Sequence, residues 1–266
     1  RKIDKDCAAV IPVHFGGQPV PMEPLMEIAR DHNLKVIEDC AHCAGGSYHG
    51  RKLGTWGDIG CFSFEEKKAM TTGDGGMLSA GDPDLLEPLR AIRWVGIDKD
   101  TWRRVRGYTA GDDEDARHWY YEIATAGFKY NMNDLMAAIG LAQLKKLDRM
   151  NARRSQIIRR YIAGLADCPY VEPLLPYDNL EHGAYWLFGV RSEHRDELIV
   201  HLKHHGIATS VHYTPLTLHP LFADHKEAVP HTLELYDRIL TLPLYADMTD
   251  EECDYVVEAI REFRPR

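Results

Sequence analysis

The chain has 266 residues, of which 44% are hydrophobic and 27% charged, the balance of a folded globular protein. This length allows one large domain or two smaller ones. The net charge of −9 argues against a broad binding surface for nucleic-acid phosphates, although a few local donors can still hold a small anionic ligand. No apolar run is long enough to cross a membrane and no secretory leader opens the chain. We therefore expect a cytoplasmic protein with neither a nucleic-acid nor a membrane partner.

Strand and helix patterns alternate over residues 1–80. The helical spacing of Leu25, Ile28 and Ala29 predicts a helix over 21–33. Short apolar runs predict strands at 8–13, 34–39, 60–64 and 75–80. Alternating strands and helices predict an α/β domain with a mostly parallel sheet. In such sheets the chemistry gathers at the carboxyl ends of the strands.

The middle of the chain predicts a helix, a loop and a long connecting helix. Asp82 and the following proline predict the start of a helix over 82–94. Residues 97–121 are polar and aperiodic, which predicts a long loop. A long helical pattern then begins at about Asn133, and its length suggests that it connects two domains.

The C-terminal part of the chain predicts a smaller α+β domain. We expect strands at 184–190 and 207–213 and helices at 194–205 and 249–263. The last helix begins with the capping box Thr249-x-x-Glu252.

Six cysteines are scattered through the chain, and two of them form a C-x-x-C within DCAHC at 39–43. His42 lies between the two cysteines, and His49 follows. One such pair is half of a zinc site, and no second C-x-x-C is present. We therefore expect reduced, buried thiols just past a strand, and no metal site.

A lysine pair within 61–78, Lys67 and Lys68, follows an apolar strand and precedes a glycine cluster. An enzyme that uses pyridoxal phosphate (PLP) needs a lysine amine for the cofactor aldehyde, a carboxylate beside the pyridine nitrogen, and donors for the phosphate. Asp39, Ser63 and Lys68 offer these groups at consecutive strand ends. They can equally be a helix cap, a strand filler and a surface charge, so the spacing alone leaves the choice open.

Longer strings of residues favour the cofactor interpretation. The string VIEDCAHCAGGSYHGRKLGTWGDIGCFSFEEKKAMTTGDGGML, at 36–78, resembles the sugar aminotransferases of the DegT/DnrJ/EryC1/StrS family. The pattern of that family is close to V-I-E-D-x-A-x-x-x-G, then G-D-x-x-x-F-S-F-x-x-x-K, then G-[DE]-G-G. Further strings resemble the family in the same order, so the resemblance covers nearly the whole chain. They lie at 11–19, 127–148, 206–222 and 240–260.

The resemblance implies roles for four residues in the first half of the chain. Lys68 matches the lysine that forms the Schiff base with PLP, and Lys67 is then a neighbour. Asp39 matches the carboxylate that pairs with the pyridinium nitrogen. His42 matches a position near the ring hydroxyl of the cofactor, and Ser63 matches a phosphate ligand.

Three further residues gain expected roles from the same resemblance. Asn131 matches a residue that the dimers of this family lend to the phosphate site of the neighbouring subunit, although a helix N-cap would also explain it. His212 and Tyr213 match a segment near the sugar site, and core packing explains them nearly as well.

The resemblance implies a fold of PLP-dependent transferase type I, which is aspartate aminotransferase-like. We expect a large α/β domain over 1–148 and a small α+β domain over 149–266. Members of the family begin well before Arg1, with a segment that supplies a Gly-Thr-Ala/Ser phosphate motif and an aromatic side chain that stacks on the cofactor. Neither motif is found here, so we expect the N-terminal part of the large domain to be absent.

The residue at position 68 also bears on the reaction. Some relatives carry histidine there and act as 3-dehydratases of keto-deoxysugars, so Lys68 favours transamination. KKAMTTGDGG is most similar to the perosamine branch and GFKYNMND to the aminoarabinose branch, and both act at C4 of the sugar. The resemblance therefore implies a homodimer with shared active sites that moves an amino group, from glutamate, to a nucleotide-linked 4-keto-(6-deoxy) sugar. Two other hypotheses stay open: a non-catalytic sensor or structural homologue of this family, and a C-x-x-C metal or redox module.

Overall fold

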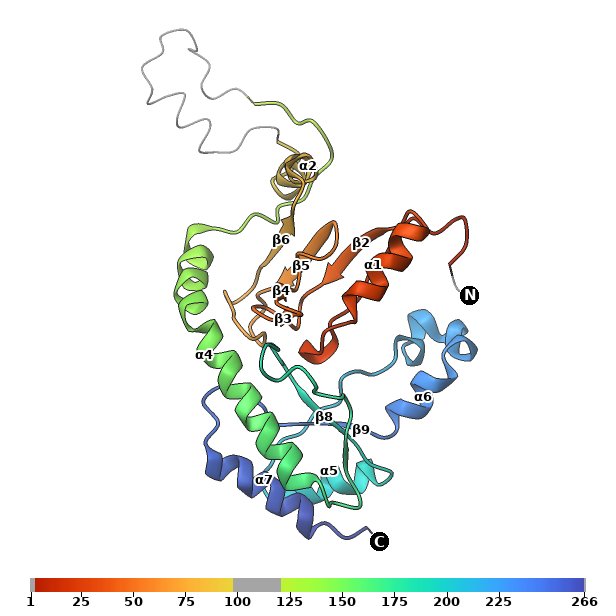
Figure 1. Cartoon of the computed structure of the whole chain (residues 1–266), viewed down its shortest axis with the longest axis vertical. Coiled ribbons are helices and arrows are strands. Elements are labelled where there is room, and N and C mark those ends of the chain that lie inside the picture. Colours follow the sequence, from red (N-terminus) through yellow and green to blue (C-terminus); the bar gives the residue numbers. More distant parts are fainter. Residues whose placement is uncertain (1–2, 98–120, 266) are drawn as a thin grey trace.

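Two main β-sheets, one from each half of the chain, are joined by the long helix α4 (Asp134–Leu165), as Figure 1 shows. The computed structural model describes residues 3–97 and 121–265, apart from the side chains of 226–228. Within this part of the chain, no helix is both long enough and apolar enough to cross a bilayer. The loop expected over 97–121 lies outside the described residues except at its two ends.

The first sheet has four strands in the order β1-β2-β5-β6. These are β1 (Ala9–Val10), β2 (Lys35–Asp39), β5 (Ile59–Ser63) and β6 (Gly76–Ala80). The pairs β1·β2 and β2·β5 are parallel, whereas β6 is antiparallel to β5. The strand expected at 8–13 is shorter than predicted because Pro12 has no N–H for the ladder, and Val13 rejoins the sheet only through a bridge to Asp39. The mostly parallel α/β sheet is therefore confirmed.

Two helices and a small hairpin accompany this sheet. Helix α1 (Met22–Asp31) buries Met22 and Ala29 against Leu34 and Val36, which attaches it to β2. Helix α2 (Pro83–Arg93) begins as predicted, with Asp82 as its N-cap. A small hairpin of β3 (Ser47–Tyr48) and β4 (Arg51–Lys52) lies between β2 and β5 in the chain.

The second sheet is antiparallel, in the order β7-β8-β9. Its strands are β7 (Glu172–Pro173), β8 (Phe188–Arg191) and β9 (Ile239–Leu242). The accompanying helices are α5 (Arg195–His204), α6 (Pro230–Tyr236) and α7 (Asp250–Glu262), and short 3₁₀ segments are η1 (Phe15–Gly17), η2 (Leu216–Leu218) and η3 (Pro220–Ala228). The expected helices at 194–205 and 249–263 are confirmed, as is the capping box of α7.

Two strand predictions in this half were wrong in position or kind. The strand expected at 184–190 begins only at Phe188, because Trp186 instead donates its backbone N–H to Gly16 in the first half of the chain. The segment 207–213 is not a strand, since it pairs with β9 only at Ser210, in an isolated bridge to Thr241.

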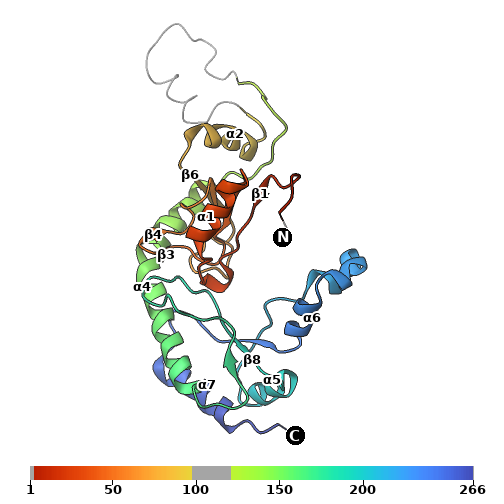
Figure 2. The same cartoon turned by 45° about the vertical axis from the view of Figure 1, so that its right-hand side comes forward.

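Helix α4 packs on both halves of the molecule, and Figure 2 shows it passing along both. Near its middle, Leu147 belongs to a buried cluster with Phe64 and Met70. About three to five turns later, Ile157, Tyr161 and other buried residues of α4 belong to the large core of the C-terminal half, together with residues of α7 such as Ile260. A single helix therefore fixes the position of the second sheet against the first.

Candidate active site

Asp39 and Ser63 lie at the same edge of the first sheet. In the parallel pair β2·β5, Asp39 is opposite Cys61, so Ser63 follows two residues beyond it. The Asp39 Oδ1 accepts a hydrogen bond from the N–H of Ala41, and the Ser63 hydroxyl accepts one from the N–H of Glu65. These are the strand ends at which the sequence predicts chemistry.

In the loop after β5, the side chains of Lys67 and Lys68 lie in different surroundings. Its ends are closed by hydrogen bonds from the Phe64 N–H to Gly75 O and from the Thr72 N–H to Phe64 O. The Lys67 side chain is 74% exposed and points to solvent. Lys68 is only partly exposed, and its Nζ lies 4.5 Å from the centre of an indole ring on the site side. The loop therefore presents Lys68, and not Lys67, to the site.

His42 is buried beside Lys68. Its Nδ1 accepts the N–H of Gly16 at 3.2 Å, and its Nε2 lies 3.3 Å from the Tyr213 hydroxyl oxygen. Burial, followed by the nearby charge of Lys68, lowers the pKa of His42 to about 4. The imidazole is therefore neutral at pH 7, and because Nδ1 accepts, its proton lies on Nε2.

His212 and Tyr213 reach the same place from the second half of the chain. The His212 Nδ1 lies 2.9 Å from the Thr241 hydroxyl, and burial, then the charge of Lys68, lowers the pKa of His212. Burial, then the charges of Glu65 and Asp39, raises the pKa of Tyr213. The structure thus brings both residues close to Lys68, and their expected role near the sugar stays a prediction.

Asn131 is not brought to this group of residues. Its Oδ1 accepts a hydrogen bond from Lys129 Nζ at 2.6 Å, before α4 begins. The N-cap of α4 is Asn133, which accepts the Met136 N–H, so the alternative explanation of Asn131 as a cap was wrong. Its expected role at a neighbouring subunit's phosphate site stays a prediction.

Trp186 is a site residue that sequence reasoning missed. Its indole stacks on His42, with the ring centres 4.2 Å apart and the planes 20° apart, and its Nε1 donates to Lys67 O at 2.6 Å. The residue lies in a run that predicts a core strand, AYWLFGV, so an aromatic side chain there carried no signal of a site.

Two buried polar residues of α4 hold the backbone next to the site, and sequence reasoning missed them too. Arg154 is buried and donates to Ala69 O at 3.0 Å, directly after Lys68. Asn151 donates to Ala44 O at 2.9 Å and accepts from Arg154. A polar pair spaced i, i+3 on the otherwise apolar face of a helix is the signal that would have indicated them.

A second buried cluster is formed by His14, Cys40 and Cys43. The side-chain atoms with which these residues could bind a metal lie within 4.8 Å of one another. This is the C-x-x-C pair, but with His14 in place of the His42 or His49 considered from the sequence. The His14 Nδ1 accepts the Val20 N–H, and its Nε2 bonds to the carboxylate of Glu38. With both ring nitrogens in use, His14 has no free lone pair for a metal, and the expectation of buried thiols is met.

The groups at this edge suit PLP. A partly shielded lysine, a carboxylate and a hydroxyl follow one another at neighbouring strand ends, with a neutral imidazole beside the lysine. They are the functional groups that the cofactor's aldehyde, pyridine nitrogen, phosphate and ring hydroxyl require.

Comparison with known proteins agrees with this geometry. The family model of the DegT/DnrJ/EryC1/StrS aminotransferase family matches residues 1–261. The spore coat polysaccharide biosynthesis protein SpsC of Bacillus subtilis (strain 168) is 38% identical over 265 residues, covering 96% of this chain and 66% of SpsC. The chain thus spans just under two thirds of the length of such curated relatives.

Solved structures show the same fold. The aminotransferase TlmJ from Streptoalloteichus hindustanus has a TM-score of 0.84 at 29% identity, over 98% of this chain and 66% of TlmJ. The PLP form of a putative sugar aminotransferase, Spr1654 from Streptococcus pneumoniae, has a TM-score of 0.82 at 26% identity, over 97% of this chain and 69% of Spr1654. The expected PLP-dependent transferase fold is therefore confirmed, and PLP is the cofactor of the family. The chain belongs to the DegT/DnrJ/EryC1/StrS aminotransferase family.

Proposed function

We propose that the protein containing this chain is a PLP-dependent aminotransferase that moves an amino group from glutamate to a nucleotide-linked 4-keto-(6-deoxy) sugar. The observation that carries the proposal is the placement of Lys68 beside neutral His42 and near Asp39, at the carboxyl edge of the sheet. Membership of an aminotransferase family supports the reaction type. The name of SpsC, a spore coat polysaccharide biosynthesis protein, supports a sugar as the acceptor.

The residues of the chain divide the work of holding the cofactor. Bound PLP supplies an aldehyde for the amino group and a ring that withdraws electrons from the reacting carbon. In this proposal the carboxylate of Asp39 holds a proton on the pyridine nitrogen, and the Ser63 hydroxyl binds the phosphate. His42, with its proton on Nε2, serves as a neutral hydrogen-bonding group beside the ring hydroxyl.

Lys68 moves the proton in this proposal. Transamination needs one base that takes a proton from the carbon of the donor and returns it to another carbon. The Lys68 amine lies over the Trp186 indole and is only partly exposed, so it is held within the site. In this proposal His212 and Tyr213, next to the Trp186 indole and His42, offer hydrogen-bonding groups to the hydroxyls of the sugar.

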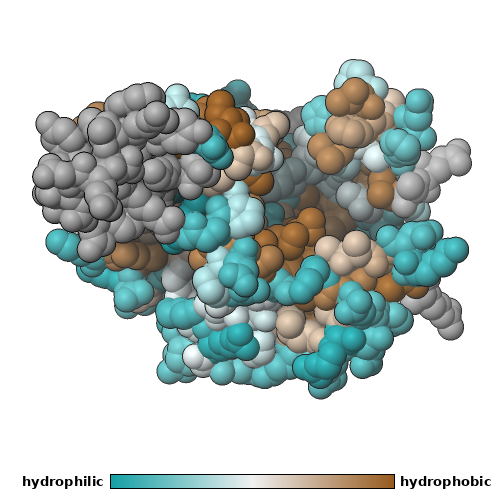
Figure 3. Space-filling model, turned by 90° about the horizontal axis from the view of Figure 1, so that it is seen from above, coloured by the Kyte–Doolittle hydropathy of each residue, from teal (hydrophilic) through white to brown (hydrophobic). Residues whose placement is uncertain are grey.

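We also infer a homodimer in which Asn131 acts at the partner's phosphate site. The Asn131 side chain bonds to Lys129 and not to the residues gathered around Lys68, which is compatible with this role. The exposed apolar side chains of the first half of α4 offer a surface for a second copy. Figure 3, the view from above, shows further apolar side chains near the middle of that face.

The domain boundary that we propose lies within α4, between a large domain over 1–148 and a small domain over 149–266. Leu147 packs in the cluster of the first half, whereas Ile157 and Ile158 pack in the core of the second. A boundary near the middle of the helix is consistent with both clusters.

The reaction can be tested with the full-length protein, PLP, glutamate and candidate nucleotide-linked 4-keto sugars. We expect an amino sugar and 2-oxoglutarate in equal amounts, both identified by mass spectrometry. Lys68→Ala should abolish transfer, and Lys67→Ala is the matched control that should retain it. A protein that binds PLP through Lys68 but transfers nitrogen to no keto sugar would instead support the sensor hypothesis.

A further inference from the structure

Trp186 comes from the second half of the chain but lies against the first. Its backbone N–H donates to Gly16 O at 2.9 Å. The neighbouring Gly17 has a φ of 91°, and a Cβ there would lie 2.4 Å from Ala184 O. Only glycine permits this close approach, so the segment before β8 is seated on η1 at a fixed position.

The indole of Trp186 holds the backbone next to the reactive lysine. Its Nε1 donates to Lys67 O at 2.6 Å, while Arg154 donates to Ala69 O on the other side. The two peptide carbonyls that flank Lys68 are thus each held by a long side chain from another element. This leaves the lysine loop little freedom to shift along the sheet edge.

The same ring contacts two functional side chains at once. His42 stacks on it at 4.2 Å between ring centres, and Lys68 Nζ lies 4.5 Å from its centre. An ammonium over an indole face is attracted by the ring electrons, which favours one direction for the lysine chain. The stacked indole also covers one face of the imidazole and excludes water from it.

We propose that Trp186 is a positioning residue for the transamination proposed above: it fixes the lysine loop through Lys67 O and keeps His42 dry by stacking. The expected kinetic effects of Trp186 rest on that proposed function. Its contacts with Lys67 O and His42 do not, since they lie within this chain.

The two contacts of Trp186 can be separated by substitution. Trp186→Phe keeps an aromatic ring for His42 but removes the Nε1 donor to Lys67 O. Trp186→Leu removes both the ring and the donor while keeping an apolar side chain. Trp56→Phe is the control, because Trp56 is also an indole with a basic side chain over it, Arg51 at 4.9 Å, outside this group of residues.

The first measurement is an NMR titration of His42, whose resonance is assigned with a His42→Asn variant. Burial and the charge of Lys68 hold the pKa of His42 at about 4. We expect that pKa to stay low in Trp186→Phe and in the control, and to rise toward 6.5 in Trp186→Leu because water reaches the ring. An unchanged pKa in folded Trp186→Leu would overturn the stacking role.

The second measurement is steady-state kinetics of the holoenzyme. Trp186→Phe should lower kcat roughly tenfold with less than about a threefold change in KM for the keto sugar, because a misplaced group slows the chemical step more than binding. Trp186→Leu should lower kcat by roughly 100-fold. A kcat of Trp186→Phe equal to that of the wild type would overturn the anchoring role.

The outcomes distinguish the two proposals. If the wild-type protein transfers no amino group, the proposed function and the expected effect of Trp186 on kcat are both overturned. The His42 titration still decides the stacking role of Trp186. If Trp186→Leu does not fold, as judged by circular dichroism, Trp186→Phe still tests the anchor.

Discussion

Glu38 is fully buried next to Asp39, and it organises the turn that follows the small hairpin. Its carboxylate accepts the N–H groups of Gly54, Trp56 and Gly57 and bonds to His14. Burial opposes the charged form, but these hydrogen bonds outweigh it and lower the pKa of Glu38. A buried charge with four partners stabilises this fold only as long as all four are kept.

We predict that Glu38→Gln lowers the free energy of unfolding by about 2–4 kcal/mol at pH 7. The amide NH₂ of glutamine would face backbone N–H groups and leave donors unpaired. Urea unfolding followed by circular dichroism measures the loss, and Glu66→Gln is the control, because Glu66 is exposed. A loss no larger than that of the control would contradict this account of Glu38.

The same carboxylate predicts a pH dependence. A group whose pKa is lowered by folding stabilises the protein above its unfolded pKa, near 4.5, and this contribution is lost as the pH falls through the lowered folded value. The difference in stability between wild type and Glu38→Gln should therefore narrow below about pH 4.5. Unfolding curves between pH 3 and 7 test this, and a constant difference would count against it.

At this scale the sequence predicted those site residues whose signals are local. Asp39, His42, Ser63 and Lys68 lie in one string, and the structure places them around one sheet edge. Trp186, Asn151 and Arg154 reach the site through contacts with segments far away in the chain. No local pattern encodes such contacts, because the neighbours of a side chain depend on how whole elements pack.

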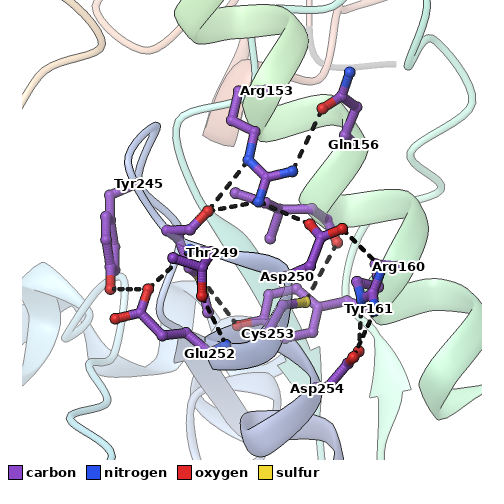
Figure 4. A network of polar contacts seen from close by, with 12 residues as sticks. Arg153, Gln156, Arg160, Tyr161, Tyr245, Thr249, Asp250, Glu252, Cys253 and Asp254 are labelled. Carbon is purple, nitrogen blue, oxygen red and sulfur yellow. Dashed lines mark hydrogen bonds and ion pairs between the residues drawn. The ribbon is translucent and has the colours of Figure 1, made fainter.

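Among the elements, α7 is attached to α4 by a polar network, which Figure 4 shows in close view. Arg153 donates to Met248 O and to Asp250, and Arg160 pairs with Asp250 and Asp254. These ion pairs are exposed, and each contributes little by itself. The start of α7 depends more on its capping box, in which Thr249 and Glu252 satisfy each other's backbone N–H groups.

We predict that Thr249→Ala destabilises the protein by about 1 kcal/mol, because the N–H of residue 252 loses its acceptor at the first turn of α7. Glu252→Ala should act through the same box, so the double variant should lose less than the sum of the two single losses. Glu251→Ala, in the same turn, is the control. Strict additivity in urea unfolding would show that the box does not act as one unit.

Element predictions succeeded where the pattern is long and failed where strand pairing decides. The long helix and α7 have periodicity and caps, and both were predicted. The segment 207–213 was predicted as a strand, yet it pairs with β9 only through Ser210. How many residues of a segment pair with a neighbouring strand depends on how the two meet in the folded chain, and this is not visible in either segment alone.

For the whole molecule, the first half of α4 carries large apolar side chains in solvent. Leu135, Leu141 and Leu144 are 79%, 65% and 56% exposed. Aromatic residues just before the helix continue this apolar surface, with Phe128 and Tyr130 more than half exposed. Several large apolar side chains exposed in one region are typical of a protein interface, and we propose that they belong to the interface of the homodimer inferred above.

We predict that the full-length protein sediments as a dimer and that Leu141→Glu shifts it toward the monomer, because a carboxylate in an apolar interface is left unpaired. Sedimentation velocity over a range of concentrations measures the change. Val200→Glu is the matched control, since Val200 is an exposed apolar residue of α5. A wild-type monomer, or equal dissociation in both variants, would contradict the assignment.

The central claim is that Lys68 is the residue that bonds PLP. The most direct measurement is borohydride reduction of the PLP-loaded full-length protein, followed by proteolysis and mass spectrometry of the peptide that spans both lysines. The account predicts the reduced cofactor on Lys68 and its loss in Lys68→Ala, with Lys67→Ala still labelled. Label on Lys67, or no label on either lysine, would contradict it.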